Sequence, residues 1–557
     1  MIAMLQSDAS SGASRVAAGR LVTLINPPSP METFGTSLLS IPPIGLAYVA
    51  AALERAGYTV DLVDGFGEWI EEEATLEIGD RTVALHGGSL EAVAARIHPE
   101  TVLVGITCMF MHHWPVVRSL VERIRARLPG VPVVLGGEHA SGGARYCLQE
   151  SAVDAIVRGE GEETIGPLAE ALLSGGSLHS IAGIAFKDAD GHICVTPPRA
   201  RIRDVGSIAR PAWHLVRVAD YMRKARFHGP STGSSMPILA TRGCPYQCTF
   251  CTSPSMWTTQ WTARAPEDVV DEMSCYREAY GARDFQFVDL TAIVKKDWIL
   301  AFCDALSARG WTDVTWQLPS GTRSEAIDEK VASRLVATGC KLLTYAPESG
   351  SVAVLKRIKK KVNLDRMKQS IRSAHRAGAR VECFLIIGFP DETLHEILQT
   401  YWFILQLVWI GVDSIGYSGY RPVPGTEISD RLVAEGGLDY GDDVYLSLMK
   451  STSFFQSVSW SQRFSDLQLS LLRVFGLALF YGGRFLSRPW VLPVLARNVL
   501  VRRQSTKLDR VLIDLTDLLR GRARGWWLGA EEERARRRAG PGFQRISDSG
   551  PRELLHR

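Results

Sequence analysis

The chain has 557 residues, of which 46% are hydrophobic and 22% are charged, and its 63 basic and 60 acidic side chains leave a net charge of +3. This length predicts roughly two to four domains, and the balanced charge gives no global signature of nucleic-acid binding. No uninterrupted 18-residue apolar run occurs, and residues 1–20 lack the apolar segment of a signal peptide, so we expect neither a spanning helix nor export.

From residue 21 onward, short β-rich runs alternate with helical patterns. This alternation predicts βαβ units and a doubly wound parallel sheet covered on both faces. We assign this Rossmann-like domain to residues 20–180 and predict that residues 1–19 before it are disordered. The predicted strands are 21–26, 59–64, 101–107, 131–136 and 153–158, and the predicted helices are 43–56, 114–128 and 162–173.

Two glycine-rich loops follow strands of this domain, Gly136-Gly-Glu-His139 and Arg158-Gly-Glu-Gly-Glu-Glu-Thr164. Ligands of such sheets bind at the carboxyl ends of the strands, and glycine lets the backbone approach them closely. The second loop leads directly into a helix whose first amides could hold a phosphate. Ordinary doubly wound domains have similar turns, so the loops alone leave ligand binding open.

A second alternating series follows a linker that is rich in Arg, Gly, Ser and Pro. Six strands with intervening helices predict a partial (β/α)6 barrel, whose chemistry gathers at the carboxyl ends of the strands. We place the linker at 181–233 and the barrel at 234–438. The predicted barrel strands are 236–241, 284–289, 313–318, 341–346, 380–387 and 412–419.

Three of the ten cysteines, Cys244, Cys248 and Cys251, stand directly after the first of these strands, in a Cys-x3-Cys-x2-Cys segment. Thiolates bind iron–sulfur clusters, and a cubane cluster normally takes four, so three leave one iron open to a small chelating molecule. A zinc site would need paired cysteines and a fourth Cys or His at a matching spacing, which is absent nearby. The segment has an odd number of cysteines, three, which disfavours disulfide pairing within it.

Polar or glycine-rich groups also end the later barrel strands. Asp289 ends the second strand, Arg323 follows the third and suits bidentate capture of a carboxylate, and Glu348 follows the fourth. Each has an ordinary alternative, as a helix cap, a surface ion pair and a solvated loop charge respectively. Their joint position at successive strand ends favours one shared site.

Together with the cysteine segment, these features resemble the cobalamin-dependent radical S-adenosylmethionine (radical SAM) family over residues 20–450. The shared motifs are Asn26-Pro-Pro, Ile41-Pro-Pro-Ile-Gly-Leu-Ala-Tyr48, Gly136-Gly-Glu138, Arg158-Gly-Glu-Gly-Glu162, the cysteine triplet, Glu348-Ser-Gly, Gly388-Phe-Pro and Pro424-Gly-Thr. The resemblance implies a [4Fe–4S] cluster on the three cysteines, SAM and cobalamin. It implies SAM contacts from Phe250, Asp289, Arg323, Glu348, Ser349 and Gly388, and cobalamin contacts from Pro43, Gly105, Thr107, Cys108, Gly136, Gly137, Glu138, Gly159, Glu160, Gly161 and Glu162.

One departure concerns the lower face of cobalt. The Asp-x-His-x-x-Gly motif that supplies an axial histidine in classical B12 mutases is absent after the first strand, as is usual in the radical SAM branch. His112 and His113 follow the third strand and could approach the corrin, but two histidines at a helix start are more often polar edge residues. The neighbouring Met109, Phe110 and Met111 suit packing beneath the ring.

The rest of the chain carries weaker signals. We expect residues 439–528 to form a mostly helical domain and 529–557 a disordered tail. The segment 401–410 is predicted to form a buried helix. The segment 467–482 could belong to the core or lie on a membrane surface, and we favour the core because its sequence has no clean polar face. The Lys-rich segment 356–361 reads as a solvated helix face. Core positions are expected for Cys275, Cys303, Cys340 and Cys383.

In the resembled family, reductive cleavage of SAM gives a 5′-deoxyadenosyl radical, and methylcobalamin donates a methyl group. We therefore expect methylation of an unactivated carbon of a lipid or secondary metabolite. The alternatives are cyclisation, carbon–carbon coupling or oxidation on the same scaffold, a non-catalytic cobalamin-binding module, and a radical SAM enzyme that has lost cobalamin and keeps its first domain as a scaffold. We expect a hydrophobic small-molecule substrate, a flavodoxin or ferredoxin as electron donor, no nucleic acid, and a cytoplasmic location with peripheral membrane contact through the C-terminal region.

Overall fold

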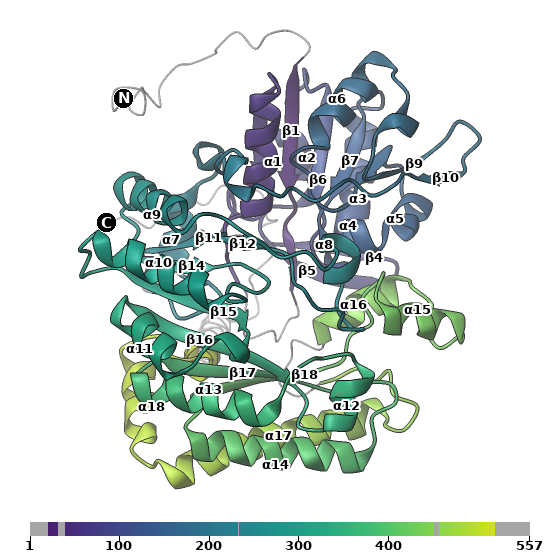
Figure 1. The fold of residues 1–557 in the computed structure, drawn as a ribbon. Coiled ribbons are helices and arrows are strands. Elements are labelled where there is room, and N and C mark those ends of the chain that lie inside the picture. The colour runs from purple at the N-terminus through teal and green to yellow at the C-terminus, as the bar shows by residue number, and fades with distance from the viewer. Residues whose placement is uncertain (1–19, 32–38, 232, 451–455, 518–557) are drawn as a thin grey trace, which may run out of the picture.

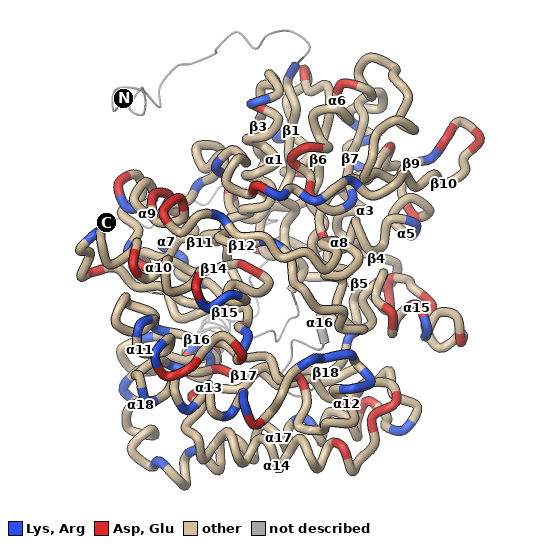
Figure 2. Tube along the Cα trace, viewed as in Figure 1, with Lys and Arg blue, Asp and Glu red and all other residues tan. Residues whose placement is uncertain are grey.

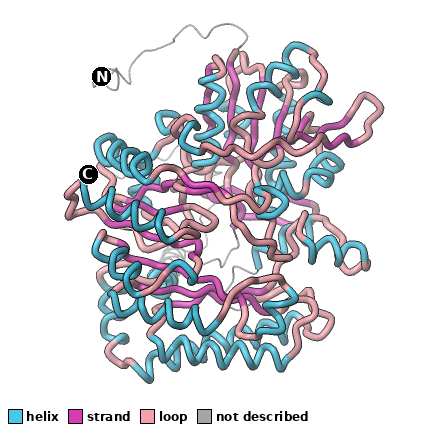
Figure 3. The backbone as a smooth tube through the Cα atoms, in the orientation of Figure 1, coloured by secondary structure: helices cyan, strands magenta, loops and turns pink. Residues whose placement is uncertain are grey.

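The computed structural model describes residues 20–31, 39–231, 233–450 and 456–517. Two α/β units lie one above the other in Figure 1, the N-terminal one in purple and blue and the second in teal and green. In each unit strands lie between covering helices, as the colouring by secondary structure in Figure 3 shows. The predicted disordered ends, 1–19 and 529–557, lie outside the described residues.

The N-terminal unit contains a seven-stranded sheet with the order β10-β9-β8-β7-β6-β1-β3. Strands β1, β3, β6, β7 and β8 run parallel, and the strand order reverses between β1 and β6, which confirms the doubly wound fold. Its strands are β1 (Leu21–Asn26), β3 (Thr59–Asp64), β6 (Leu103–Thr107), β7 (Val133–Gly136), β8 (Ala155–Val157), β9 (Ile184–Lys187) and β10 (Ile193–Val195). Its helices are α1 (Ile44–Arg55), α2 (Leu90–Arg96), α3 (Trp114–Arg127), α4 (Glu138–Gly142), α5 (Ala144–Glu150) and α6 (Ile165–Ser174).

Two features of this unit differ from the prediction. The sheet continues past residue 180 through the antiparallel strands β9 and β10, so the first part of the expected linker belongs to the sheet. A separate antiparallel sheet, β2-β5-β4, was not predicted. All these strands are short or half exposed, and such strands give little hydrophobic pattern. Their bounds are β2 (Ser29–Met31), β4 (Glu73–Ile78) and β5 (Arg81–His86).

The second unit is a six-stranded parallel sheet with the order β11-β14-β15-β16-β17-β18, open between its first and last strands. This confirms the partial barrel. The strands are β11 (Ser235–Ile238), β14 (Asp284–Phe287), β15 (Thr315–Thr322), β16 (Cys340–Glu348), β17 (Arg380–Ile387) and β18 (Ser414–Gly419). The helices before and around it are α7 (Val218–Lys224), α8 (Ser253–Trp257), α9 (Pro266–Tyr280), α10 (Lys296–Ala308), α11 (Glu329–Ala337), α12 (Val352–Arg357), α13 (Leu364–Ala377) and α14 (Leu394–Ile410).

The C-terminal part is helical, as expected. It comprises α15 (Glu427–Ala434), α16 (Asp442–Lys450), α17 (Asp466–Ser487), α18 (Val491–Leu500) and a helix at 507–517. The last helix lies at the amino end of the barrel, where Lys507 pairs with the buried Glu382 at 2.9 Å and Arg510 donates to the Gly229 carbonyl at 3.0 Å. The helical domain therefore helps to close the end of the barrel that faces away from the N-terminal unit.

Two helices are less buried than the sequence suggested. In α14, Trp402 and Trp409 are 54% and 61% exposed, because this helix buries only the face that packs on the barrel. In α17, the side chains of Leu469, Arg473 and Phe480 are buried, while much of its apolar surface faces outward. The expectation of a core helix therefore holds for one stripe of α17 and is wrong for the rest. Cys303, Cys340 and Cys383 are buried as predicted, whereas Cys275 is exposed.

Candidate active site

The three clustered cysteines lie on one loop at the carboxyl end of the first barrel strand. The loop is bounded by the short antiparallel strands β12 (Thr241–Arg242) and β13 (Thr262–Ala263). Cys244, Cys248 and Cys251 are all partly buried and none forms a disulfide. Burial raises the pKa of the Cys251 thiol to about 12, so this thiol stays protonated unless a metal takes the place of the proton.

Asp289 fixes the start of this loop. Its carboxylate accepts hydrogen bonds from the Thr241 backbone N–H, the Thr241 hydroxyl at 2.6 Å and the Ala240 N–H at 3.3 Å. Burial raises its pKa to about 6, although these hydrogen bonds oppose the shift. Thr291 lies two residues further and donates to the Cys244 sulfur at 3.5 Å. The structure thus places Asp289 in a positioning role, and the predicted SAM contact from its buried carboxylate stays a prediction.

A cluster of charges surrounds Cys248. The Arg323 guanidinium lies 3.7 Å from the centre of the Tyr246 ring, which belongs to the cysteine loop. Glu348 has a positive φ of 64° and accepts a hydrogen bond from Lys360 Nζ at 2.7 Å. Burial raises the pKa of Cys248, and the Lys360 charge is the first influence that opposes this rise.

Lys360 is the residue of this cluster that the sequence did not reveal. It belongs to the run predicted as a solvated helix face, yet its side chain is only 11% exposed. That prediction was wrong for Lys360 because the run extends beyond α12 into a turn that folds back on Glu348. A run of five basic residues in six gives no signal as to which one turns inward.

The other predicted SAM contacts lie on the same side of the barrel. The Phe250 ring packs edge-on against Phe389, with the ring centres 5.7 Å apart. Gly388 has a φ of 82°, a left-handed conformation that favours glycine, and a Cβ there would lie 2.7 Å from Leu469. Ser349 is fully buried, with its hydroxyl 3.1 Å from that of Thr400. Its side chain is therefore engaged in the protein core.

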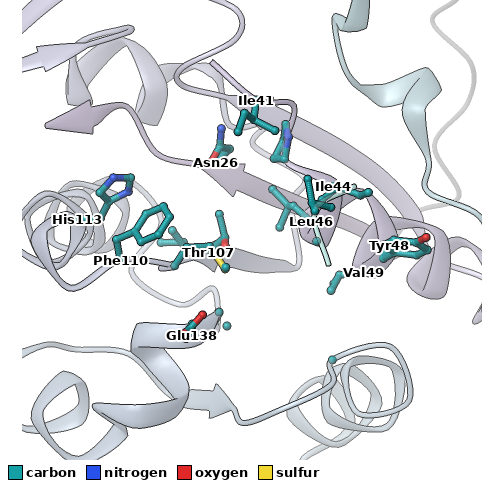
Figure 4. A pocket seen from close by; sticks show the side chains of 18 of the residues that line it. Asn26, Ile41, Ile44, Leu46, Tyr48, Val49, Thr107, Phe110, His113 and Glu138 are labelled. Carbon is teal, nitrogen blue, oxygen red and sulfur yellow. The ribbon is translucent and has the colours of Figure 1, made fainter. Parts of the chain in front are cut away.

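A cavity of about 650 Å³ lies between the two units and is lined mainly by apolar side chains. It opens at the carboxyl ends of β1, β6, β7 and β8 and reaches the start of the barrel. Figure 4 shows Asn26, Tyr48, Thr107 and Glu138 around it. The predicted cobalamin contacts that line it are Pro43, Gly105, Thr107, Gly136, Gly137, Glu138, Gly159, Glu160, Gly161 and Glu162.

Cys108 is the exception among the predicted cobalamin contacts. It is fully buried, belongs to the core beneath the sheet and does not line the cavity. The reason lies in the turn that follows β7, since the Cys108 backbone N–H donates to the Gly136 carbonyl at 2.7 Å. Gly137 has a φ of 109°, and a Cβ there would lie 2.6 Å from the Cys108 carbonyl oxygen. Only glycine fits so close an approach.

The glycine-rich loop after β8 holds the entry to the cysteine loop. Arg242, two residues before Cys244, is 4% exposed and pairs with Glu160 at 3.2 Å and with Glu162 at 2.5 Å. Glu160 also accepts from Arg201 at 2.7 Å. Arg242 belongs to no recognised motif, so its contact with these carboxylates could not be predicted.

The glycine-rich loop after β7 holds the exit of the cysteine loop. The Thr252 hydroxyl, directly after Cys251, donates to the Glu138 carboxylate. Burial raises the pKa of Glu138, and this hydrogen bond opposes the rise. We refer to these contacts, Arg242 with Glu160 and Glu162 and Thr252 with Glu138, as the clasp. Both ends of the cysteine loop are thereby fixed to the walls of the cavity.

Three histidines lie near one side of the cavity. His112 and His113 line it, and burial lowers the pKa of His113 to about 4. His139 is buried behind them with no hydrogen-bond partner at either ring nitrogen, and burial lowers its pKa to about 3. These histidines are therefore neutral near pH 7. Their ring nitrogens do not converge on a common point within metal-binding distance in the described chain.

The residues fit the three groups that the sequence implied. The cysteine loop offers three thiols, and the cavity offers backbone edges and apolar walls at the position where doubly wound sheets bind cofactors. A cation–carboxylate cluster beside Cys248 suits the amino and carboxylate groups of an amino acid.

Comparison with known families agrees with this geometry. Residues 33–169 match the model of the B12 binding domain, and residues 238–404 match that of the Radical SAM superfamily. The two matched ranges correspond to the doubly wound sheet and to the barrel.

Curated relatives cover most of the chain. The chain is 29% identical over 434 residues to a cytidylyl-2-hydroxyethylphosphonate methyltransferase of Streptomyces wedmorensis, covering 72% of this chain and 80% of the relative. It is 27% identical to an anaerobic magnesium-protoporphyrin IX monomethyl ester cyclase of Cereibacter sphaeroides, covering 71% and 60%. It is 24% identical to the hopanoid C-3 methylase of Methylococcus capsulatus, covering 72% and 70%.

Two solved structures share the fold. One is the radical SAM methyltransferase TsrM from Kitasatospora setae, with cobalamin and a [4Fe–4S] cluster bound, at a TM-score of 0.57 and 20% identity over 76% of this chain and 79% of that one. The other is the cobalamin-dependent SAM radical enzyme OxsB with aqua-cobalamin and SAM bound, at a TM-score of 0.56 and 15% identity over 75% and 55%.

Proposed function

Since the chain belongs to the cobalamin-dependent radical SAM family, we propose that it methylates an unactivated carbon of a lipid or secondary metabolite. It is a radical SAM enzyme, and its cofactors are a [4Fe–4S] cluster, SAM and cobalamin. When bound, these cofactors supply reductive cleavage of SAM and a methyl group carried on cobalt.

The clasp is the observation that carries this proposal. Two carboxylate-bearing loops line the cavity, and the same carboxylates hold the two ends of the cysteine loop. A group on the cysteines and a group in the cavity would therefore share one interior. Such an arrangement suits a reaction in which one cofactor activates the substrate and the other transfers a group to it.

The chain's own residues bind and orient the reactants. We assign Cys244, Cys248 and Cys251 to the cluster, and Arg323 with Lys360 to the carboxylate of SAM, because both cations lie beside Cys248. Glu348, which pairs with Lys360, suits the amino group of SAM. The apolar walls of the cavity disfavour water in this interior.

Radical chemistry without methyl transfer is the second candidate. The relatives include cyclases as well as methyltransferases, and the same motifs serve both. Mass spectrometry of the product separates the two candidates. With methyl-labelled SAM, a methylated product carries the label, whereas a cyclised or coupled product does not.

The first test is anaerobic purification and cluster reconstitution of the chain and of the variant Cys248→Ala. We expect about four irons and one cobalamin per chain, with SAM cleaved to 5′-deoxyadenosine on reduction. Cys248→Ala should lose the cluster and SAM cleavage but keep cobalamin, because Cys248 lies outside the cavity lining.

The variant Cys275→Ala is the matched control, since Cys275 is exposed on α9 and far along the chain from the loop. It should keep iron and activity. Iron without cobalamin would remove methyl transfer from cobalt, and a chain that holds neither group would refute the proposal.

We also propose a reducing, cytoplasmic setting and a small flavodoxin or ferredoxin as the electron donor. The ten cysteines are free, which fits a compartment where thiols stay reduced. Reductive cleavage of SAM consumes an electron, and a low-potential carrier of this kind would supply it.

We further propose that one face of the enzyme rests on an anionic membrane surface. The face is formed by α14 and α17, which run along the base of the molecule in Figure 1, and by α18 at the lower left, and Figure 2 shows mostly tan tube along the base. Exposed large apolar side chains gather on it: Leu394, Leu398, Trp402, Trp409, Leu467, Leu471, Phe475, Leu486, Trp490, Leu492, Val494 and Leu500. We call this surface the apolar face.

Charge complementarity argues for a lipid surface as its occupant. Between residues 467 and 508 the sequence has seven basic residues and no acidic one, and Arg488, Arg497 and Arg503 among them are neither fully buried nor paired with a carboxylate of the described residues. By length and composition, Asp466–Ser487 could also cross a membrane, and 28% of its most apolar window is buried. Because α17 packs on α14 and β18 along one side, we favour a helix that lies in the plane of the interface.

A further inference from the structure

A buried positive charge stands at the carboxyl end of the last barrel strand. Arg421 comes two residues after β18 and is partly buried. Its Nε atom is shielded from solvent and has no hydrogen-bond partner. Burial lowers its pKa, and no carboxylate of the described residues opposes that change.

A second guanidinium lies close by on α17. Arg473 is 2% exposed, and burial together with the charge of Arg421 lowers its pKa to about 10. Like charges repel, and the repulsion is strong where water is excluded. The barrel edge next to α17 therefore concentrates positive charge.

The charge of Arg421 also acts on a residue that lines the cavity between the two units. His112 lines the cavity, and its pKa lies well below the usual range because of burial, then His113, and then the charge of Arg421. The carboxyl end of a barrel strand is also where such folds carry out their chemistry. Arg421 itself is not among the residues that line the cavity, and it stands at the carboxyl end of β18, at the other end of the sheet order from the strand that leads into the cysteine loop.

Two other buried guanidiniums of this chain have carboxylate partners. Arg242 pairs with Glu160 and Glu162, and Arg264 pairs with Asp268 at 2.7 Å and with Glu272. Burying a charge without such a partner is costly, and a planar guanidinium binds carboxylate or phosphate groups through two parallel hydrogen bonds. Arg421 has no such carboxylate partner among the described residues, and a bound anion would provide the missing negative charge.

We propose that Arg421, next to the charge of Arg473, binds an anionic group of the substrate, namely a phosphate, phosphonate or carboxylate. The inference rests on the proposed function, because it assumes that a small molecule reacts in this interior. It narrows the substrate class to molecules that carry such a group beside an unactivated carbon. The anionic group is held at the end of β18, and the reacting carbon extends toward the cysteine loop.

The test uses the reconstituted enzyme with cluster, cobalamin and SAM, titrated with inorganic phosphate and with methylphosphonate against chloride at equal ionic strength. The wild-type chain should bind both probes, and Arg421→Met should bind them about tenfold more weakly or worse. Arg431→Met is the matched control, since Arg431 lies nearby in sequence but pairs with Asp391 at the surface, and it should bind as the wild type does.

Thermal unfolding gives an independent readout. Without phosphate, Arg421→Met should melt at or above the temperature of the wild-type chain, because it removes an uncompensated charge. Arg242→Met should melt lower, because it leaves Glu162 without its partner. If Arg421→Met fails to fold, Arg421→Lys replaces it, which keeps the charge and loses the two-pronged contact.

Three results would overturn the proposal. They are no phosphate binding by the wild-type chain, unchanged binding by Arg421→Met, and a loss of SAM or cobalamin affinity in Arg421→Met, which would assign the anion to a cofactor. Iron content, cobalamin content and SAM cleavage of the same wild-type preparation test the proposed function separately. A failure of the anion site alone would leave those three values intact.

Discussion

At the scale of single residues, burial and partners set the charge of each carboxylate near the site. Glu392 lies just before α14 and Glu396 in its first turn, both close in sequence to the Gly388 turn. Glu396 pairs with Arg357 at 2.6 and 2.9 Å, and this pairing holds its pKa at about 2. Glu392 is 1% exposed and accepts only backbone hydrogen bonds, and burial raises its pKa to about 7. A cation thus decides which of the two is charged at neutral pH.

Glu392 should make the stability of the protein depend on pH. Its folded-state pKa lies above the unfolded value, so its contribution is fully present below about pH 4.5 and is lost as the pH rises through 7. The variant Glu392→Gln keeps an acceptor for the Gly388 N–H and cannot ionise. From pH 5 to 8, we expect the variant to gain up to about 3 kcal/mol relative to the wild type in denaturant unfolding. Parallel pH profiles would contradict this assignment.

At the scale of elements, α17 is fixed to the barrel by a narrow stripe. Gly476 lies against the rings of Tyr417 on β18 and Tyr401 on α14, and its neighbours along the stripe are buried. The absence of a side chain at this position lets the helix approach the strand closely. The rest of α17 contributes little to the core, which is why its hydrophobic composition misled the prediction.

Replacement of Gly476 by alanine should loosen this contact. A Cβ at this position would lie 2.5 Å from the Tyr417 ring, so we expect Gly476→Ala to destabilise the fold by about 1–3 kcal/mol. Gly482→Ala on the same helix is the control, because nothing lies within 4 Å of the added atom. It should stabilise by about 0.5–1 kcal/mol. Equal effects of the two changes in thermal unfolding would show that α17 is not held there.

At the scale of the whole molecule, the apolar face and the active-site interior lie on different sides of the barrel. The apolar face lies on the outside of α14 and α17, whereas the cysteine loop faces the N-terminal unit. The enzyme could therefore rest on a membrane while its cofactors stay shielded. A substrate with an apolar part would then be concentrated at that surface.

Vesicle binding tests the apolar face. The double variant Trp402→Ser/Trp409→Ser should co-sediment about tenfold more weakly with vesicles of phosphatidylcholine containing phosphatidylglycerol as roughly a third of the lipid. Salt should weaken the binding of the wild-type chain. Val195→Ser, on β10 in the N-terminal unit, is the control for loss of an exposed apolar side chain. A wild-type chain that dimerises instead of binding vesicles would assign the face to a second copy.

The fold could be predicted from the sequence because its strands are continuous apolar runs. Strands β1, β3 and β17 begin and end at the predicted residues. The cysteine segment could be predicted because its spacing is local. The contacts of Arg242 and Lys360 could not be predicted. The partner of Arg242 is distant in sequence, and the contact of Lys360 depends on the direction of the turn after α12. Likewise, the lack of a hydrogen-bond partner at the Arg421 Nε atom is visible only in the folded structure.

The clasp has a consequence for how such a protein can be rebuilt. An exchange of N-terminal halves between relatives at residue 233 would separate Arg242 and Thr252 from Glu138, Glu160 and Glu162. Each half could fold, yet the hybrid would have mismatched charges at its seam. A working chimera must therefore carry the segment 241–263 along with the N-terminal half. The junction at which two relatives can be joined therefore lies inside the barrel, after the end of its first strand.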